Sequence, residues 1–315
     1  MLLTGLPLTH TLPYVCRSPH GHTVLPFFNL KQPTMKQILL ALLPAILLVP
    51  AVQAQPSKLL EKKLELQMPD GNGANGASVA FHTGNKHYYS AIAGNKSYAL
   101  ALFTELGKKA ANGESEAMID VRGLWFNAKR GKLMGNAYDD GGWFEYVLGK
   151  DKLPTEVKVL VEGQTQPGEQ SVGAFDVKTN EVLFFDGYDI VFYNADGEVT
   201  NTWHMEELLE EWDELEYEAE DYNQSIVYTG KAGMEYGLLN IAANRIELFG
   251  RNKKRTAFLM LPVDQPVYGV FNFAYANGYF WLFDKDKRSW TGYREGAAAP
   301  AKPNSGIRLL FMRIL

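Results

Sequence analysis

Residues 173–203 decide the fold: they read GAFDVKTNEVLFF at 173–185, DG at 186–187, IVFY at 190–193, NADG at 194–197 and VTNTW at 199–203. Short runs rich in Val, Phe, Tyr and Trp alternate here with Gly, Asn and Asp. This composition is typical of strands bounded by tight turns. The stretch therefore predicts four antiparallel strands joined by three turns.

The same pattern recurs along the chain, marked each time by an aromatic residue, a polar turn and a second apolar strand. The aromatic markers are Phe81, Phe126, Phe175, Tyr228 and Tyr275, which lie 45, 49, 53 and 47 residues apart. A repeat of this length is typical of propeller blades, each a four-stranded sheet packed against the next. We therefore expect an all-β chain that forms a β-propeller of five to six blades. A β-sandwich is the alternative.

The repeats also suggest how the chain is divided. We expect the β-propeller at residues 77–295, after a polar lead-in at 55–76 and before a linker and tail at 296–315. Two apolar stretches could supply a strand that closes the ring, Lys63–Met68 before the repeats and Ile307–Ile314 after them. The sequence does not choose between them.

An acidic segment at residues 205–221 interrupts the repeats and accounts for the longest gap between markers. Leu208, Leu209, Trp212 and Leu215 recur in it at helical spacing. This pattern predicts a short amphipathic helix that rests on the β-core through these side chains. A docking surface for a basic partner is the alternative reading.

The N-terminal region predicts export. Residues 35–54 combine one lysine, an apolar stretch of about fifteen residues and small residues before Gln55, which is the pattern of a secretory signal peptide. We expect cleavage before Gln55, a secreted or periplasmic protein, and no membrane span in the mature chain. An uncleaved anchor is the alternative. Residues 1–34 read as an upstream extension, non-native or disordered, because they lack periodicity and acidic residues.

Composition narrows the possible chemistry. The chain has a net charge of −5, and without residues 1–54 it has 28 basic and 36 acidic residues, a net charge of −8. We therefore expect no nucleic-acid partner, because phosphate binding needs a basic face. The single cysteine, Cys16, precedes the signal peptide, and the region after it has only three histidines. His82 and His87 lack a third ligand for zinc. We expect no metal, no cofactor and no catalytic residue of a recognised motif.

Candidate binding residues lie in the turns between the second and third strands of each repeat. If each aromatic marker ends an innermost strand, these turns and the starts of the innermost strands share one rim. Ligands commonly bind where a rigid scaffold presents loops around a concavity. The candidate residues are Asp139, Asp140, Trp143, Asp186, Tyr188, Arg245 and Arg122.

Residues 120–293 resemble β-propeller repeat proteins in general, through strings such as Phe-Asp-x-Lys-Thr-Asn-Glu-Val-Leu-Phe-Phe and Tyr-Asn-Ala-Asp-Gly-Glu-Val. The resemblance implies the fold and matches no subfamily with a known activity. We expect an exported, monomeric, non-enzymatic binding or scaffold protein that recognises a protein or glycan through one rim. The alternative is a secreted carbohydrate-active enzyme, a hydrolase or lyase, that uses rim carboxylates such as Asp139, Asp140 or Asp186.

Overall fold

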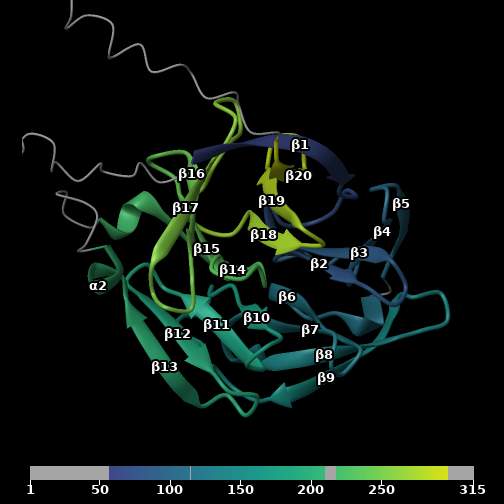
Figure 1. Cartoon of the computed structure of the whole chain (residues 1–315). Coiled ribbons are helices and arrows are strands. Elements are labelled where there is room, and N and C mark those ends of the chain that lie inside the picture. The colour runs from purple at the N-terminus through teal and green to yellow at the C-terminus, as the bar shows by residue number, and fades with distance from the viewer. Residues whose placement is uncertain (1–56, 114, 210–217, 297–315) are drawn as a thin grey trace, which may run out of the picture. The chain divides into compact units, whose positions relative to one another are not determined.

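The computed structural model describes residues 57–113, 115–209 and 218–296, which all belong to one compact unit of the chain. The upstream extension and signal peptide predicted at residues 1–54 lie outside the described residues. The part that is described is built almost entirely of strands (Figure 1). None of its helices is long and apolar enough to cross a membrane.

Three sheets of four antiparallel strands follow one another along the chain, and in each the strand order is the sequence order. We call them groups A, B and C. Group A comprises β2 (Asn75–His82), β3 (His87–Ala93), β4 (Ala101–Thr104) and β5 (Lys109–Asn112). Group B comprises β6 (Val121–Asn127), β7 (Lys132–Ala137), β8 (Trp143–Leu148) and β9 (Pro154–Val161). Group C comprises β10 (Ala174–Asp176), β11 (Glu181–Phe185), β12 (Asp189–Tyr193) and β13 (Val199–His204).

An eight-stranded sheet contains two further groups of four, D and E. Group D comprises β14 (Tyr222–Tyr228), β15 (Tyr236–Asn240), β16 (Arg245–Phe249) and β17 (Arg255–Met260). Group E comprises β18 (Phe273–Ala276), β19 (Tyr279–Asp284), β20 (Ser289–Glu295) and β1 (Ser57–Gln67). The two groups are joined where the first residues of β1 pair in parallel with β17.

The innermost strands of the five groups surround a common centre. Strand β2 contacts β6, β6 contacts β10, β10 contacts β14, β14 contacts β18, and β18 contacts β2 again. Figure 1 shows these strands around the middle, with β5, β9, β13 and β1 toward the periphery. All five aromatic markers lie on the innermost strands. The chain is therefore all-β with a propeller-like fold, and its sheets do not form the two face-packed layers of a sandwich.

Five apolar clusters, one between each pair of neighbouring groups, form the core. Aromatic side chains meet edge to face across these interfaces, as Tyr88 and Trp281 do at a centroid distance of 5.1 Å. Phe192 and Tyr236 meet similarly at 5.7 Å. Each sheet buries both faces against its neighbours, which explains why the strands read as nearly continuous apolar runs.

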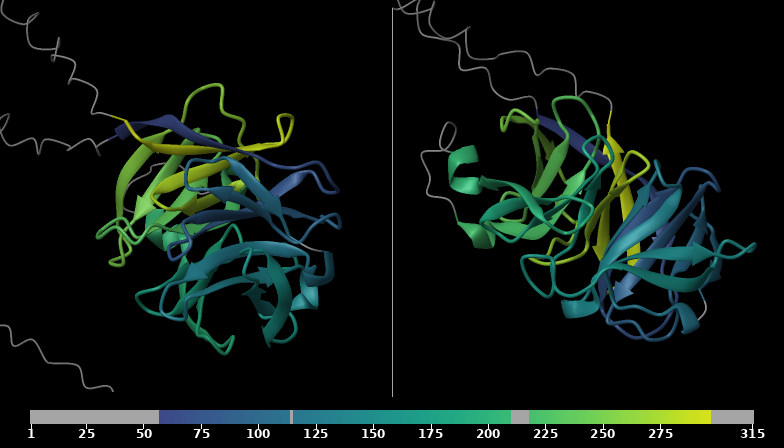
Figure 2. Two further views of the ribbon diagram at one scale, coloured as in Figure 1. Left: turned by 90° about the vertical axis from the view of Figure 1, so that its right-hand side faces the viewer. Right: turned by 90° about the horizontal axis from the view of Figure 1, so that it is seen from below.

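Strand β1, near the start of the described chain, completes the last group. It pairs antiparallel with β20 from Leu60 to Gln67, and Figure 2 shows the purple first strand beside the yellow last one. Leu60 and Leu66 are buried in two different interface clusters. The closing position is therefore occupied by the lead-in strand, while residues 307–314, the other candidate, lie outside the described residues.

Only the two ends of the acidic segment, residues 205–209 and 218–221, belong to the described part of the chain. Helix α2 spans Met205–Leu209, and a 3-10 turn, η3, spans Ala219–Asp221. Met205 and Leu208 are buried against groups C and D, so this end of the segment does rest on the β-core. Trp212 and Leu215 lie outside the described residues. Two other 3-10 turns, η1 (Ser115–Ala117) and η2 (Asp139–Gly141), lie between strands.

Candidate functional site

A central cavity of about 380 Å³ lies between the innermost strands, and all five groups contribute to its wall. Its volume is within the range of small-molecule sites. The wall is built from the ends of β2, β6, β10, β14 and β18 and from the residues that follow them, including Thr83, Ala128, Val177, Thr229 and Asn277. The cavity therefore reaches the rim at which the first turn of each group lies. We call this cavity the channel and that opening its mouth.

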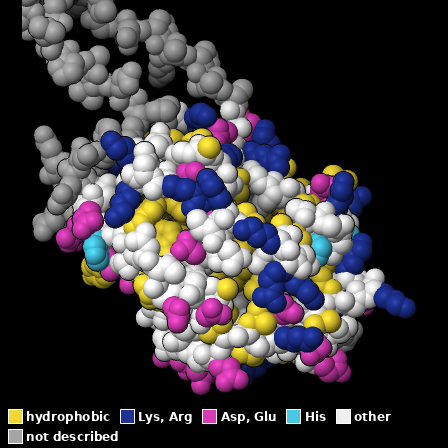
Figure 3. Space-filling model, turned by 60° about the horizontal axis from the view of Figure 1, so that its bottom comes forward, with side chains coloured by type: hydrophobic (Ala, Val, Ile, Leu, Met, Phe, Trp, Pro, Cys, Tyr) yellow, Lys and Arg dark blue, Asp and Glu magenta, His cyan; other side chains and the backbone are white. Residues whose placement is uncertain are grey.

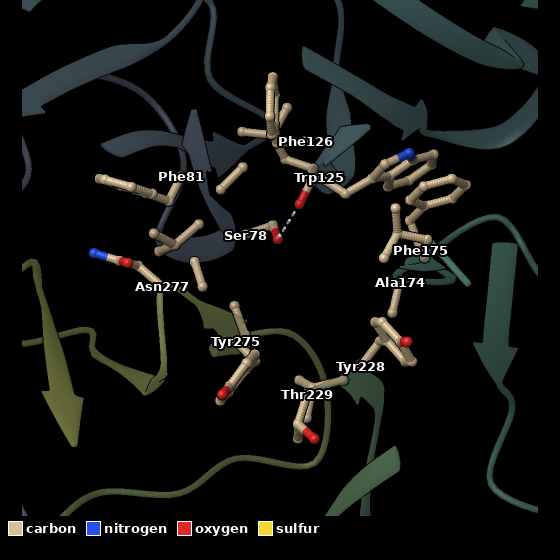
Figure 4. A pocket seen from close by; sticks show the side chains of 18 of the residues that line it. Ser78, Phe81, Trp125, Phe126, Ala174, Phe175, Tyr228, Thr229, Tyr275 and Asn277 are labelled. Atoms are coloured by element: carbon tan, nitrogen blue, oxygen red, sulfur yellow. Dashed lines mark hydrogen bonds between the residues drawn. The ribbon is translucent and has the colours of Figure 1, made fainter. Parts of the chain in front are cut away.

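The five aromatic markers surround the mouth. Figure 4 shows Phe81, Phe126, Phe175, Tyr228 and Tyr275 around the opening, each from a different innermost strand. All five are packed against an aromatic ring of their own group or a neighbouring one: the ring centroids of Phe81 and Tyr88 are 4.7 Å apart, for example. All five are half-buried. Each marker thus fills the wedge between neighbouring sheets and also lines the mouth.

The channel offers uncharged hydrogen-bonding groups. Ser78 Oγ donates to the carbonyl oxygen of Leu124 at 3.3 Å, and Thr83, Thr229 and Tyr275 bring further hydroxyls to the wall. Each innermost strand pairs with one neighbour in its own sheet, so the backbone of its other edge faces inward. No Asp, Glu, Lys, Arg or His is among the described residues that line the channel.

A buried charge network stands behind one marker, Tyr228. The Arg251 guanidinium donates to the Tyr228 hydroxyl at 3.3 Å and to the Tyr236 hydroxyl at 2.8 Å, and it forms an ion pair with Asp176. Tyr236 in turn donates to the Asp176 carboxylate at 3.0 Å. These bonds join groups C and D and fix the position of the Tyr228 ring at the mouth.

The network also shifts the pKa values of its members. Burial alone would raise the pKa of Asp176, but hydrogen bonds from Arg251 and from the backbone N–H groups of Lys178 and Thr179 outweigh it and hold that pKa below its usual range. Burial, followed by the nearby Asp176 charge, raises the pKa of Tyr228. The Tyr228 hydroxyl, which accepts from Arg251, is therefore neutral at neutral pH.

Arg122, one of the candidate binding residues, lies at the opposite end of the innermost strands. Its side chain is 5% exposed, and it donates to the Asp120 carboxylate and to Gln170 Oε1. The guanidinium also lies 5.5 Å from the ring centroid of Phe271. Because Arg122 belongs to group B and Phe271 immediately precedes group E, which is not its neighbour, this contact crosses the central axis. Arg122 thus helps to close the channel at the end opposite its mouth.

The other candidate residues lie on that same far rim, in the turns where the sequence predicts them, and none of them lines the channel. Asp139 and Asp140 form η2. Asp186 and Tyr188 share a separate hollow of about 320 Å³ with Glu220 and neighbouring residues. The structure thus places Asp186 and Tyr188 in one hollow, whereas the other candidate residues do not line it.

The remaining candidates have structural partners. Arg245 forms an ion pair with the buried Glu247 at 2.6 Å and lies 4.1 Å from the ring centroid of Phe258. Trp143 is buried at the interface of groups B and C, where its ring centroid is 6.0 Å from that of Phe184. Sequence reasoning identified these positions by turn type, which does not reveal how deeply a side chain is buried.

The described residues contain no group of three or more His, Cys, Asp or Glu side chains that could hold a metal ion. His82 lies against Phe126 with ring centroids 4.2 Å apart, and burial lowers its pKa. The His87 ring hydrogen-bonds through Nδ1 to the backbone carbonyl of Asn85 at 2.6 Å. Both histidines are therefore engaged in local packing and turn structure.

The residues that surround the mouth are the aromatic repeat markers of the sequence, and their spacing alone predicts the architecture but not the lining of a cavity. A second signal was available. Each marker precedes a polar turn, which places it at the end of an innermost strand and next to solvent. Five half-buried aromatic residues repeated around one axis therefore mark the opening of the channel.

No protein-family model and no curated protein matches the chain. Similar solved structures include a nidogen/laminin complex (TM-score 0.37, 10% identity), of which the chain covers 62% with 58% of its own length. They also include a catalytically inactive virginiamycin B lyase from Staphylococcus aureus with quinupristin (TM-score 0.38, 12% identity). That match covers 71% of this chain and 67% of the lyase chain. A third is a protein of unknown function from Bacteroides thetaiotaomicron (TM-score 0.43, 8% identity), and that match covers 75% of each chain. Matches at this level assign no ligand or activity to this chain.

Proposed function

We propose that this chain is an exported, monomeric β-propeller with one blade per four-stranded group, five in all, and that it binds an uncharged saccharide at the channel mouth. The observation that carries the proposal is the lining of the channel: five half-buried aromatic residues at the mouth, hydroxyl groups beside them, and no charged side chain among the described lining residues.

This lining suits a sugar on chemical grounds. The C–H face of a pyranose ring is apolar and covers an aromatic ring, while its hydroxyls both donate and accept hydrogen bonds. Tyr228, Tyr275 and the inward strand edges supply partners of both kinds. A charged ligand would lose its hydration without gaining a counter-ion in the channel. The contact between Arg122 and Phe271 at the far end favours entry of a chain end over the passage of a continuous chain.

The alternative, a carbohydrate-active enzyme, needs two carboxylates at the substrate. The carboxylates that the sequence offered, Asp139, Asp140 and Asp186, lie on the rim opposite the mouth. An aromatic and hydroxylic surface without a carboxylate pair supports binding more than hydrolysis or lyase chemistry. Export and cleavage before Gln55 remain part of the proposal, and N-terminal sequencing of the exported protein tests them: an intact Met1 refutes that part.

A binding experiment tests the saccharide proposal directly. A glycan array screened with the purified protein, followed by calorimetry with each neutral oligosaccharide that it retains, should identify a ligand. Thr83 is an exposed turn residue on the wall of the mouth, so Thr83→Trp should obstruct it and weaken binding at least tenfold.

Thr179 supplies the matched control. It is an exposed threonine in the corresponding turn of group C, but it does not line the channel, so Thr179→Trp should bind like wild type. The proposal fails if the array retains no neutral glycan, or if both variants bind as well as wild type. Release of sugar product, abolished by Asp139→Asn or Asp186→Asn, would favour the enzyme instead.

A further inference from the structure

A second cavity lies beside the channel. It measures about 270 Å³ and runs between groups B and C, and we call it the crevice. Arg130, Asn180 and Asp196 line its outer part, and all three belong to turns on the same rim as the channel mouth. Trp125 and Phe175 line both cavities. Their rings are stacked at 14° with centroids 6.3 Å apart, so this pair is the partition between channel and crevice.

The crevice has unusual donors in its wall. Trp125 is 6% exposed and Trp143 is 3% exposed, both line the crevice, and neither indole nitrogen has a hydrogen-bond partner. Figure 4 shows the Trp125 nitrogen on the side of the ring away from the centre of the channel. A buried indole N–H without an acceptor costs free energy, and such a group in a native protein calls for a specific explanation. Two such tryptophans line the same cavity, although their indole nitrogens themselves are covered by protein atoms.

The other lining residues define the chemistry of an occupant. Met134, Val161 and Val182 are apolar, and Phe175 presents an aromatic ring. An indole N–H only donates, so the matching groups on the ligand are acceptors. Arg130 is the one Lys or Arg among the described residues that line the crevice, and it already donates to Glu145 at 2.9 Å. A ligand therefore needs no negative charge to neutralise it.

We propose that the crevice binds a flat, uncharged aromatic molecule that carries carbonyl acceptors, with Trp125 and Trp143 as the donors. Both nitrogens are shielded from solvent, so the indole rings shift slightly when the acceptors reach them. Trp143 was a candidate binding residue from sequence, and here it acquires a specific role. This site is distinct from the saccharide site, although the Trp125–Phe175 pair lines both cavities.

The test uses 2,3-dimethyl-1,4-naphthoquinone as the probe and 2,3-dimethylnaphthalene, which has the same ring system without carbonyls, as its matched control. The readout is the ¹H–¹⁵N resonance of each indole in protein labelled at tryptophan, assigned through Trp→Phe variants. The quinone should shift the resonances of Trp125 and Trp143. Trp290 provides the internal control, because its indole nitrogen is also buried without a partner but lines neither cavity.

Variants then measure the contribution of each donor. Trp125→Phe and Trp143→Phe each keep an aromatic wall and remove one N–H, and each should weaken quinone binding about fivefold or more. Trp290→Phe should leave it unchanged, and so should Thr83→Trp, which obstructs only the channel. The proposal is overturned if neither crevice indole shifts, if Trp290 shifts equally, or if the hydrocarbon binds as tightly as the quinone. None of these results depends on whether the channel binds a saccharide.

Discussion

Glu247 on β16 has none of its surface exposed, and it is surrounded by donors. It accepts hydrogen bonds from Arg255 Nη1 at 2.9 Å, from Arg245 Nε at 2.8 Å and from the Tyr222 hydroxyl at 3.2 Å. The two arginines differ in their access to water, because the Arg255 side chain is 3% exposed and that of Arg245 is 25% exposed. Loss of the carboxylate would therefore affect Arg255 most.

We predict a large loss of stability for Glu247→Met. Breaking a buried ion pair by removing one partner costs about 3–5 kcal/mol, and here the buried donors of Arg255 and Tyr222 would lose the Glu247 carboxylate as their acceptor. For a domain of this size, 1 kcal/mol corresponds to about 2–4 °C, so the apparent Tm should fall by roughly 6–20 °C. The double variant Glu247→Met/Arg255→Met replaces both charges by apolar side chains and should recover most of this loss.

Thermal and urea unfolding of wild type, both single variants and the double variant measure this coupling. The exposed pair Lys62–Glu65 supplies the control, since its side chains are 55% and 40% exposed. Glu65→Gln should change the free energy of unfolding by about 0–1 kcal/mol. A loss below about 1 kcal/mol for Glu247→Met, or a double variant less stable than either single variant, would refute the argument from burial.

Three further predictions concern the fold. Leu66→Ala should cost about 2–5 kcal/mol in urea unfolding because Leu66 is fully buried, whereas Leu59→Ala, at a position 58% exposed, should be nearly neutral; equal losses would contradict the closing role of β1. Gly142 and Gly131 both have positive φ (73° and 65°), but of the two only Gly142 has a backbone carbonyl where a Cβ would lie. Gly142→Ala should therefore lower Tm clearly more than Gly131→Ala. Similar Tm values for the two variants would refute this. The depressed folded-state pKa of Asp176 means that its stabilisation is present above the unfolded pKa of about 3.9 and is lost as pH falls through the lower folded value. Asp176→Asn should therefore lose stability less steeply in acid than wild type, as measured by thermal unfolding, and parallel curves would exclude this role.

The propeller-like arrangement could be predicted because one local pattern is repeated. In group C, the turn residues and apolar runs of 173–203 correspond to four observed strands. The closing strand could not be chosen in advance, because Lys63–Met68 and Ile307–Ile314 have similar composition. The structure pairs β1 with β20, which is more than 200 residues away, and such pairing leaves no local signal.

The site was harder to predict than the fold. Turn chemistry placed Asp139, Asp186 and Arg245 on a common rim, but it could not show that Arg122 would be drawn inward by Asp120 and Gln170. The mouth lies on the opposite rim. There the same aromatic residues pack between the sheets and line the channel, so the sequence pattern does not separate the two roles. On the face in Figure 3, acidic and basic side chains are interspersed, which illustrates why total charge alone could not locate a binding surface.

The pairing of β1 with β20 has a consequence for biosynthesis. A ribosome produces Leu60 and Leu66 early, but their partners on the last sheet follow only when residue 295 has been added. Until then the last sheet lacks its outer strand, and the edge of a sheet without its partner strand is a site for pairing with other chains. The ring can therefore close only after both β1 and β20 are present.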